Sequence, residues 1–106
     1  MLYRYKMLVT YTEIGMSQIQ NTVRRAAEFK QTAAQMGVTV EEMHWTLGLY
    51  DAIVTVACED EESILALATF VSRQGYVRTQ LLRAYTDEEF GRFLAKMPKG
   101  PIELDG

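Results

Sequence analysis

The sequence has 106 residues, of which 48% are hydrophobic and 24% are charged, and its formal net charge is -3. These proportions are those of one globular domain and exclude a disordered or fibrous chain. The acidic balance offers no electrostatic footprint for nucleic acid, and no apolar run approaches the roughly 20 residues that span a bilayer, so we expect neither a nucleic-acid nor a membrane partner.

The first half of the chain predicts a strand, a helix and a second strand. The first strand is expected over residues 3–12, where Tyr, Val and Thr mix with apolar residues. A helix is predicted over residues 17–36, because apolar residues, mostly alanine, recur at helical spacing and Gly37 stands where a left-handed residue would end it. Its alanine-rich stripe predicts close packing. The second strand, residues 39–47, alternates between two faces, one of which carries Met43, Trp45 and Leu47.

The second half of the chain predicts two more strands and two helices. Residues 51–58 are apolar on both faces, which is typical of a central strand. A helix then begins at Asp60 and ends before Gly75. Residues 76–85 alternate like an edge strand. The segment Thr86-Asp87-Glu88-Glu89 matches a capping box and predicts a short helix with one apolar stripe, formed by Phe90, Phe93, Leu94 and Met97.

This βαββαβ order is that of a ferredoxin-like α+β fold, with a four-stranded antiparallel sheet, two crossover helices on one face and a short C-terminal helix. We expect a single domain over residues 1–97 and a flexible C-terminal tail over residues 98–106. The two helices can cover only one sheet face, although the central strands are apolar on both. A second copy is therefore expected to cover the other face, which gives a homodimer with a barrel-like interior.

Three segments of the chain resemble the GYD-domain family. They are Tyr11-Thr12-Glu13-Ile14-Gly15, Trp45-Thr46-Leu47-Gly48-Leu49-Tyr50-Asp51 and Val77-Arg78-Thr79-Gln80-Leu81-Leu82-Arg83-Ala84-Tyr85, and with the capped helix the resemblance covers about residues 5–96. The family is similar to the dimeric α+β-barrel proteins, which implies the same fold and a homodimer. It implies no mechanism, because the family is known by its motif and not by an established activity. Tyr11 departs from the pattern, since many relatives carry Trp there.

The turn between the second and third strands brings an indole, a phenol and a carboxylate together. Asp51 either caps turn N–H groups or lies at the mouth of a sheet-face cavity as a base or an orienting group. Trp45 and Tyr50 suit a ligand pocket or a dimer interface. His44, the only histidine, is either an exposed side chain or an acid–base group. Of the arginines on the fourth strand, Arg78 is the candidate that points into a shared cavity, so the ligand-binding candidates are His44, Trp45, Tyr50, Asp51 and Arg78.

Motifs for phosphate cofactors and serine hydrolases are absent from the sequence. One histidine and one cysteine cannot form a zinc or iron–sulfur site within one chain, so we expect no metal and no cofactor. The start, Met1-Leu2-Tyr3-Arg4-Tyr5-Lys6, is typical of a strand and not of a secretion signal, and the lone Cys58 fits a reducing compartment, so a cytoplasmic location is expected.

Two classes of function remain open. The first is a non-catalytic homodimeric module that binds a small-molecule ligand or a partner through the sheet-face cavity. The second is a cofactor-independent enzyme that acts on a small apolar or aromatic molecule. The missing catalytic constellation favours the first class. A tightly filled interior would also favour the module, whereas a buried cavity with converging polar side chains would favour the enzyme.

Overall fold

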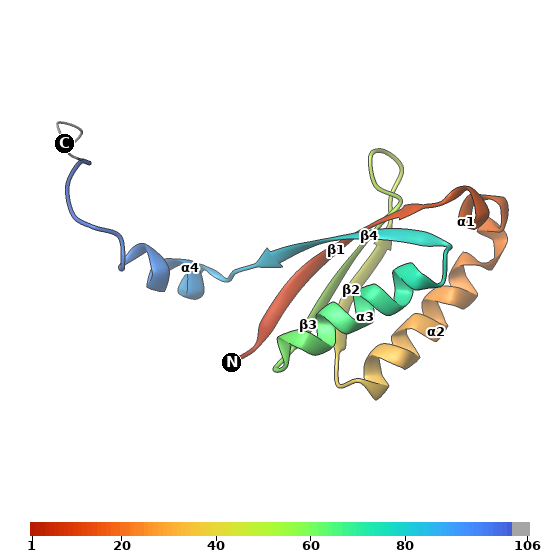
Figure 1. Ribbon diagram of the computed structural model, residues 1–106, viewed down its shortest axis with the longest axis horizontal. Coiled ribbons are helices and arrows are strands. Elements are labelled where there is room, and N and C mark those ends of the chain that lie inside the picture. The colour runs from red at the N-terminus through yellow and green to blue at the C-terminus, as the bar shows by residue number, and fades with distance from the viewer. Residues whose placement is uncertain (103–106) are drawn as a thin grey trace.

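The computed structural model describes residues 1–102 and contains a four-stranded antiparallel sheet with strand order β2-β3-β1-β4 (Figure 1). This order places β1 and β3 in the centre and β2 and β4 at the edges, which confirms the predicted ferredoxin-like α+β fold. The observed strands are shorter than predicted by one or two residues at most of their ends, and span β1 (Tyr3–Tyr11), β2 (Thr39–Trp45), β3 (Ala52–Cys58) and β4 (Val77–Ala84).

The helices α2 and α3 lie across one face of the sheet (Figure 1). The helix predicted over residues 17–36 is wrong at its start, where the chain forms a short helix and a 3-10 turn before α2. The reason is a local cap, because the Thr12 hydroxyl accepts a hydrogen bond from the Gly15 N–H at 3.1 Å and starts a separate helix. The helical segments are α1 (Glu13–Ser17), η1 (Ile19–Asn21), α2 (Thr22–Gln35), α3 (Glu61–Arg73) and α4 (Asp87–Leu94).

The core lies between the sheet and the two crossover helices. Met7 of β1 lies opposite Val54 of β3 and Leu81 of β4, so it occupies the middle of the sheet on its helix-facing side. The largest side chains that this layer buries completely are Met7, Val54, Val56, Ile64 and Leu67. Because strand residues alternate between faces, this register also decides which side chains of β1 and β3 point away from the helices.

The opposite face of the sheet, here called the open face, carries no helix of the described chain. At its middle, Leu8 pairs with Ile53, and both side chains are half-buried, whereas Leu82 on the edge strand is 47% exposed. Near its border, Arg4 forms two hydrogen bonds with Glu41, at 2.7 and 3.0 Å. This ion pair raises the pKa of Arg4 and lowers the pKa of Glu41. The Lys6 ammonium on β1 also donates a hydrogen bond to the Thr55 hydroxyl on β3 at 2.8 Å. The open face therefore mixes apolar side chains with polar ones on its central strands as well as at its border.

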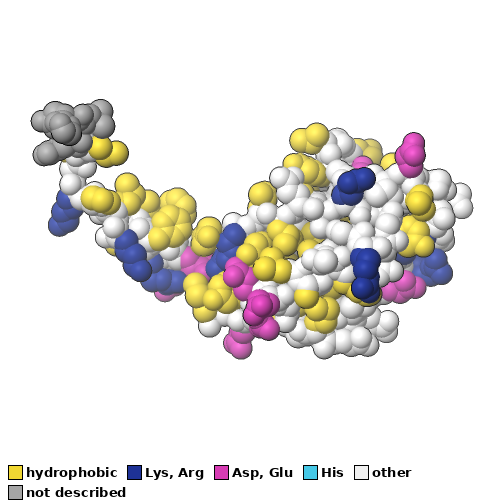
Figure 2. Space-filling model, viewed as in Figure 1, with side chains coloured by type: hydrophobic (Ala, Val, Ile, Leu, Met, Phe, Trp, Pro, Cys, Tyr) yellow, Lys and Arg dark blue, Asp and Glu magenta, His cyan; other side chains and the backbone are white. Residues whose placement is uncertain are grey.

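The C-terminal helix α4 stands away from the rest of the molecule as an arm (Figure 1). The predicted capping box is confirmed: the Glu89 N–H donates to the Thr86 hydroxyl at 3.1 Å, and the Thr86 N–H donates to the Glu89 carboxylate at 2.9 Å, which lowers the pKa of Glu89. Hydrophobic side chains gather on the surface of this arm (Figure 2), and the exposed ones are Phe90, Phe93, Leu94 and Met97.

Two further predictions concern the C-terminal tail and the membrane. Residues 98–102 form neither helix nor strand, and residues 103–106, the rest of the predicted tail, lie outside the described residues. Among residues 1–102, no helix combines the length and the apolar character that crossing a membrane requires.

Candidate functional site

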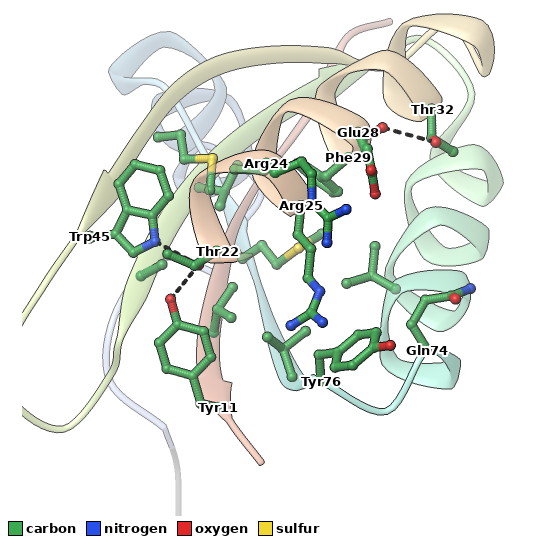
Figure 3. A pocket seen from close by; sticks show the side chains of 18 of the residues that line it. Tyr11, Thr22, Arg24, Arg25, Glu28, Phe29, Thr32, Trp45, Gln74 and Tyr76 are labelled. Atoms are coloured by element: carbon green, nitrogen blue, oxygen red, sulfur yellow. Dashed lines mark hydrogen bonds between the residues drawn. The ribbon is translucent and has the colours of Figure 1, made fainter. Parts of the chain in front are cut away.

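A pocket of about 440 Å³ lies between α2, α3 and the helix-facing side of the sheet (Figure 3). Its floor is formed by apolar side chains of all four strands, among them Met7, Val9, Met43, Ala52, Val54 and Val77. The predicted close packing of the alanine-rich helix is confirmed at the buried Ala33 but is wrong near Ala26, whose short side chain lines the pocket. Small residues on α2 thus leave space for another molecule.

Three polar groups meet on one side of the pocket. The hydroxyl oxygens of Tyr11 and Thr22 are 2.6 Å apart and share a hydrogen bond, and the Trp45 indole N–H donates to the Thr22 oxygen at 3.2 Å (Figure 3). These residues come from the end of β1, the start of α2 and the end of β2. The chain therefore builds this side of the site from the ends of elements that are far apart in sequence.

The hydrogen bond between Tyr11 and Thr22 uses only one of their two hydroxyl hydrogens. Tyr11 and Thr22 carry one O–H hydrogen each, and their mutual bond uses one of the two. Within the described residues, neither hydroxyl has another recorded acceptor, since the remaining contact, from Trp45, is one that Thr22 accepts. Whichever hydroxyl donates in the pair, the other has an O–H that a bound molecule or solvent can accept.

The Arg25 side chain is a further polar group of the pocket. The Arg25 guanidinium lies over the Tyr76 ring, 3.4 Å from its centroid (Figure 3). It also donates a hydrogen bond to the Gln18 side-chain oxygen. Arg24 and Glu28, on the same helix, line the pocket too. The charged side chains of the lining are thus two arginines and one glutamate, which gives the lining one excess positive formal charge, whereas the whole chain has a net charge of -3.

The five residues predicted for the site are not brought together. Trp45 is 44% exposed and forms a wall of the pocket, whereas its neighbour His44 is exposed on the open face, as strand alternation requires. Arg78 is exposed on the open face as well. Tyr50 reaches the same face, where its hydroxyl donates to the Gln80 side-chain oxygen at 3.2 Å.

Asp51 connects the turn to the central strand. Its carboxylate accepts a hydrogen bond from the Tyr11 N–H at 2.9 Å, and its own N–H donates to the Val9 carbonyl at 2.8 Å. The carboxylate therefore caps the end of β1 and not the N–H groups of its own turn. Through this bond Asp51 holds the residue that presents the Tyr11 phenol, but its side chain does not line the pocket. Leu47, predicted to share a face with Trp45, is fully exposed in the loop after β2.

Most polar and aromatic residues of the pocket were not predicted from the sequence, including those whose contacts define it, Tyr11, Thr22, Arg25 and Tyr76. One indication was available, because Thr22 and Arg25 are three residues apart and so lie on one side of a helix. Nothing local to Tyr76 identifies it, since it precedes β4 and meets Arg25 only through the tertiary fold.

Another cluster, at the far end of the sheet, serves the structure itself. The Arg83 guanidinium lies 4.6 Å from the Tyr85 ring centroid and 3.6 Å from the Glu89 carboxylate, which attaches the root of α4 to β4. The neighbouring Tyr5 hydroxyl donates to Glu61 at 2.6 Å, and this bond raises the pKa of Tyr5. Each charged group here has a partner within the cluster, so the cluster offers little to a ligand.

Comparison with known proteins assigns most of the chain to a family. A family model described as GYD domain matches residues 5–94 of the chain. No curated protein and no solved structure matches it. Among residues 1–102, no group of three or more His, Cys, Asp or Glu side chains is placed to hold a metal ion.

Proposed function

We propose that this chain, which belongs to the GYD domain family, is a non-catalytic binding protein for a small, mainly apolar organic molecule. The observation that carries the proposal is the pocket of about 440 Å³ between the helices and the sheet. Its volume lies within the range of small-molecule sites, and its floor is apolar, as in such sites. Converging polar groups by themselves would favour an enzyme, but the described lining holds no histidine, cysteine or serine to serve as a catalytic base or nucleophile. The proposal places the ligand on the helix-facing side of the sheet.

Filling the pocket from α2 tests this placement. Ala26 is buried and lines the pocket, so Ala26→Leu should occupy ligand space without displacing core side chains. With 2-naphthalenemethanol as a neutral probe, we expect Ala26→Leu to weaken binding by at least about tenfold in calorimetric titration. Parent protein that fails to bind this probe at millimolar concentration would contradict the proposal.

The matched control is the next residue on the same helix. Ala27 is exposed and does not line the pocket, so Ala27→Leu adds the same atoms outside the site. We expect its affinity for the probe to stay within about twofold of the parent value. Equal affinities of the two variants, with both melting temperatures near that of the parent, would move the ligand away from this pocket.

We also propose that the protein is a homodimer that joins two open faces and works in the cytoplasm. The apolar pair Leu8 and Ile53, the exposed Leu82 and the exposed stripe of α4 support the dimer, because a second copy is an economical cover for them. His44, Tyr50 and Arg78 would then line the shared sheet-face cavity. The buried free thiol of Cys58 supports the compartment.

The alternative is a cofactor-independent enzyme acting on a small apolar or aromatic molecule. The observation in its favour is that the pocket combines an unused O–H of the Tyr11–Thr22 pair with the carboxylate of Glu28, the groups that acid–base chemistry requires. Mass spectrometry of the molecule extracted from the purified protein separates the two functions. After renewed incubation with the protein, a binding protein returns the compound unchanged, and an enzyme returns a product.

A further inference from the structure

We propose that the ligand of the helix-side pocket is an aromatic carboxylate, with its carboxylate held by Arg25 and its ring on the apolar floor. This inference rests on the proposed function, and it adds the chemical class of the ligand. It starts from the sign of the charge in the pocket. Arg24 and Glu28 are exposed, whereas Arg25 is half-buried, so the charge of the lining that solvent screens least is positive and favours an anion.

Arg25 is arranged to receive a carboxylate. The face of its guanidinium lies on the Tyr76 ring, and its bond to Gln18 fixes the orientation further. Stacking uses the face of the guanidinium and leaves N–H donors at its edge, which match the two oxygens of a carboxylate. Because Arg25 is already held in place and half-buried, binding would cost little additional side-chain entropy.

The rest of the pocket suits an aromatic ring. Phe29 and Phe70 line it from the two helices, and the thioethers of Met7 and Met43 line it from the sheet. Aromatic rings contact other rings and sulfur atoms more favourably than saturated carbon does. The unused O–H of the Tyr11–Thr22 pair adds a neutral donor for an acceptor elsewhere on the ligand.

Three probes of similar shape separate charge from ring character. They are 2-naphthoate, its neutral amide 2-naphthamide, and the saturated decahydro-2-naphthoate, each titrated calorimetrically at low ionic strength. A desolvated hydrogen bond to a charged group is worth enough to give the parent protein about a 30-fold preference for naphthoate over naphthamide. We expect decahydro-2-naphthoate to bind about fivefold more weakly than naphthoate.

Arg25→Gln should remove the preference for the anion and keep the affinity for naphthamide, so that naphthoate and naphthamide bind within about threefold of each other. Lys30→Gln is the charge-matched control, since Lys30 is exposed on the same helix and does not line the pocket, and it should keep the parent preference. A preference for naphthoate that persists in Arg25→Gln would overturn the role given to Arg25.

The outcomes test the ligand class separately from the proposed binding function. Equal binding of naphthoate and naphthamide by the parent protein would overturn the anionic class and leave the pocket as a binding site. Equal or tighter binding of the saturated acid would overturn the aromatic class. Failure of all three probes would contradict both the ligand class and the proposed function.

Discussion

Replacing Gly15 by alanine is expected to lower the free energy of unfolding by about 3 kcal/mol, as an extra atom in a packed site does. A Cβ at this position would lie 1.9 Å from the Tyr76 carbonyl oxygen. That carbonyl accepts a hydrogen bond from the Thr12 N–H at 3.1 Å, and the Thr12 hydroxyl donates to the Gly75 carbonyl at 2.7 Å. The backbone on both sides is thus fixed, so the clash cannot be relieved by a side-chain rotation.

Gly15→Ala should also weaken the binding of 2-naphthoate in the pocket, because the Tyr76 ring lies under the Arg25 guanidinium. Gly91→Ala is the control, since Gly91 lies in α4 with open space around it and no positive φ. Alanine there should raise helix stability by up to about 1 kcal/mol. Chemical denaturation of both variants measures the difference, and a Gly15→Ala midpoint equal to that of the parent would contradict the packing described here.

Placing a carboxylate on the open face is expected to dissociate the proposed homodimer. We expect the parent protein to sediment as a dimer at low micromolar concentration and to bury more than about 1,000 Å² between its copies. Leu82 is 47% exposed on the edge strand, so Leu82→Glu should fold as the parent does. Its new charge would be desolvated in a sheet-face interface, which should weaken association by at least about 100-fold.

Val23→Glu is the matched control for this experiment. Val23 is 66% exposed on α2, on the other side of the sheet from the open face, so its substitution should leave the dimer intact. Sedimentation of the parent as a folded monomer would contradict the proposed dimer. Dissociation by Val23→Glu, with Leu82→Glu still dimeric, would place the interface on the helices.

The fold could be predicted because its determinants are local. Three of them act within a few residues: the apolar run of β3, the Thr86–Glu89 capping box, and Gly37 after α2, with φ of 75°. The error at the start of α2 is also local, since the Thr12 cap competes with the longer helical pattern and starts its own short helix. Periodicity alone could not decide between them.

The candidate site could be predicted only in part. Strand alternation separates Trp45 from His44, and Tyr50 and Arg78 lie on the open face where the shared cavity was expected. No pattern in the chain indicated that a pocket lies on the opposite, helix-facing side. The contact between Arg25 and Tyr76 joins residues 51 positions apart, and the space beside Ala26 depends on how α2 is set against α3. Such features arise from tertiary packing, which no short pattern in the chain encodes.

The most direct test of the account is to locate the bound probe on one face of the sheet by NMR. Neighbouring residues on the central strands serve as internal controls, because Val9 and Val54 face the helices and Leu8 and Ile53 face the other way. With 2-naphthoate bound, we expect nuclear Overhauser contacts from the naphthalene protons to the methyl groups of Val9 and Val54. Contacts to Leu8 and Ile53 in their place would contradict it.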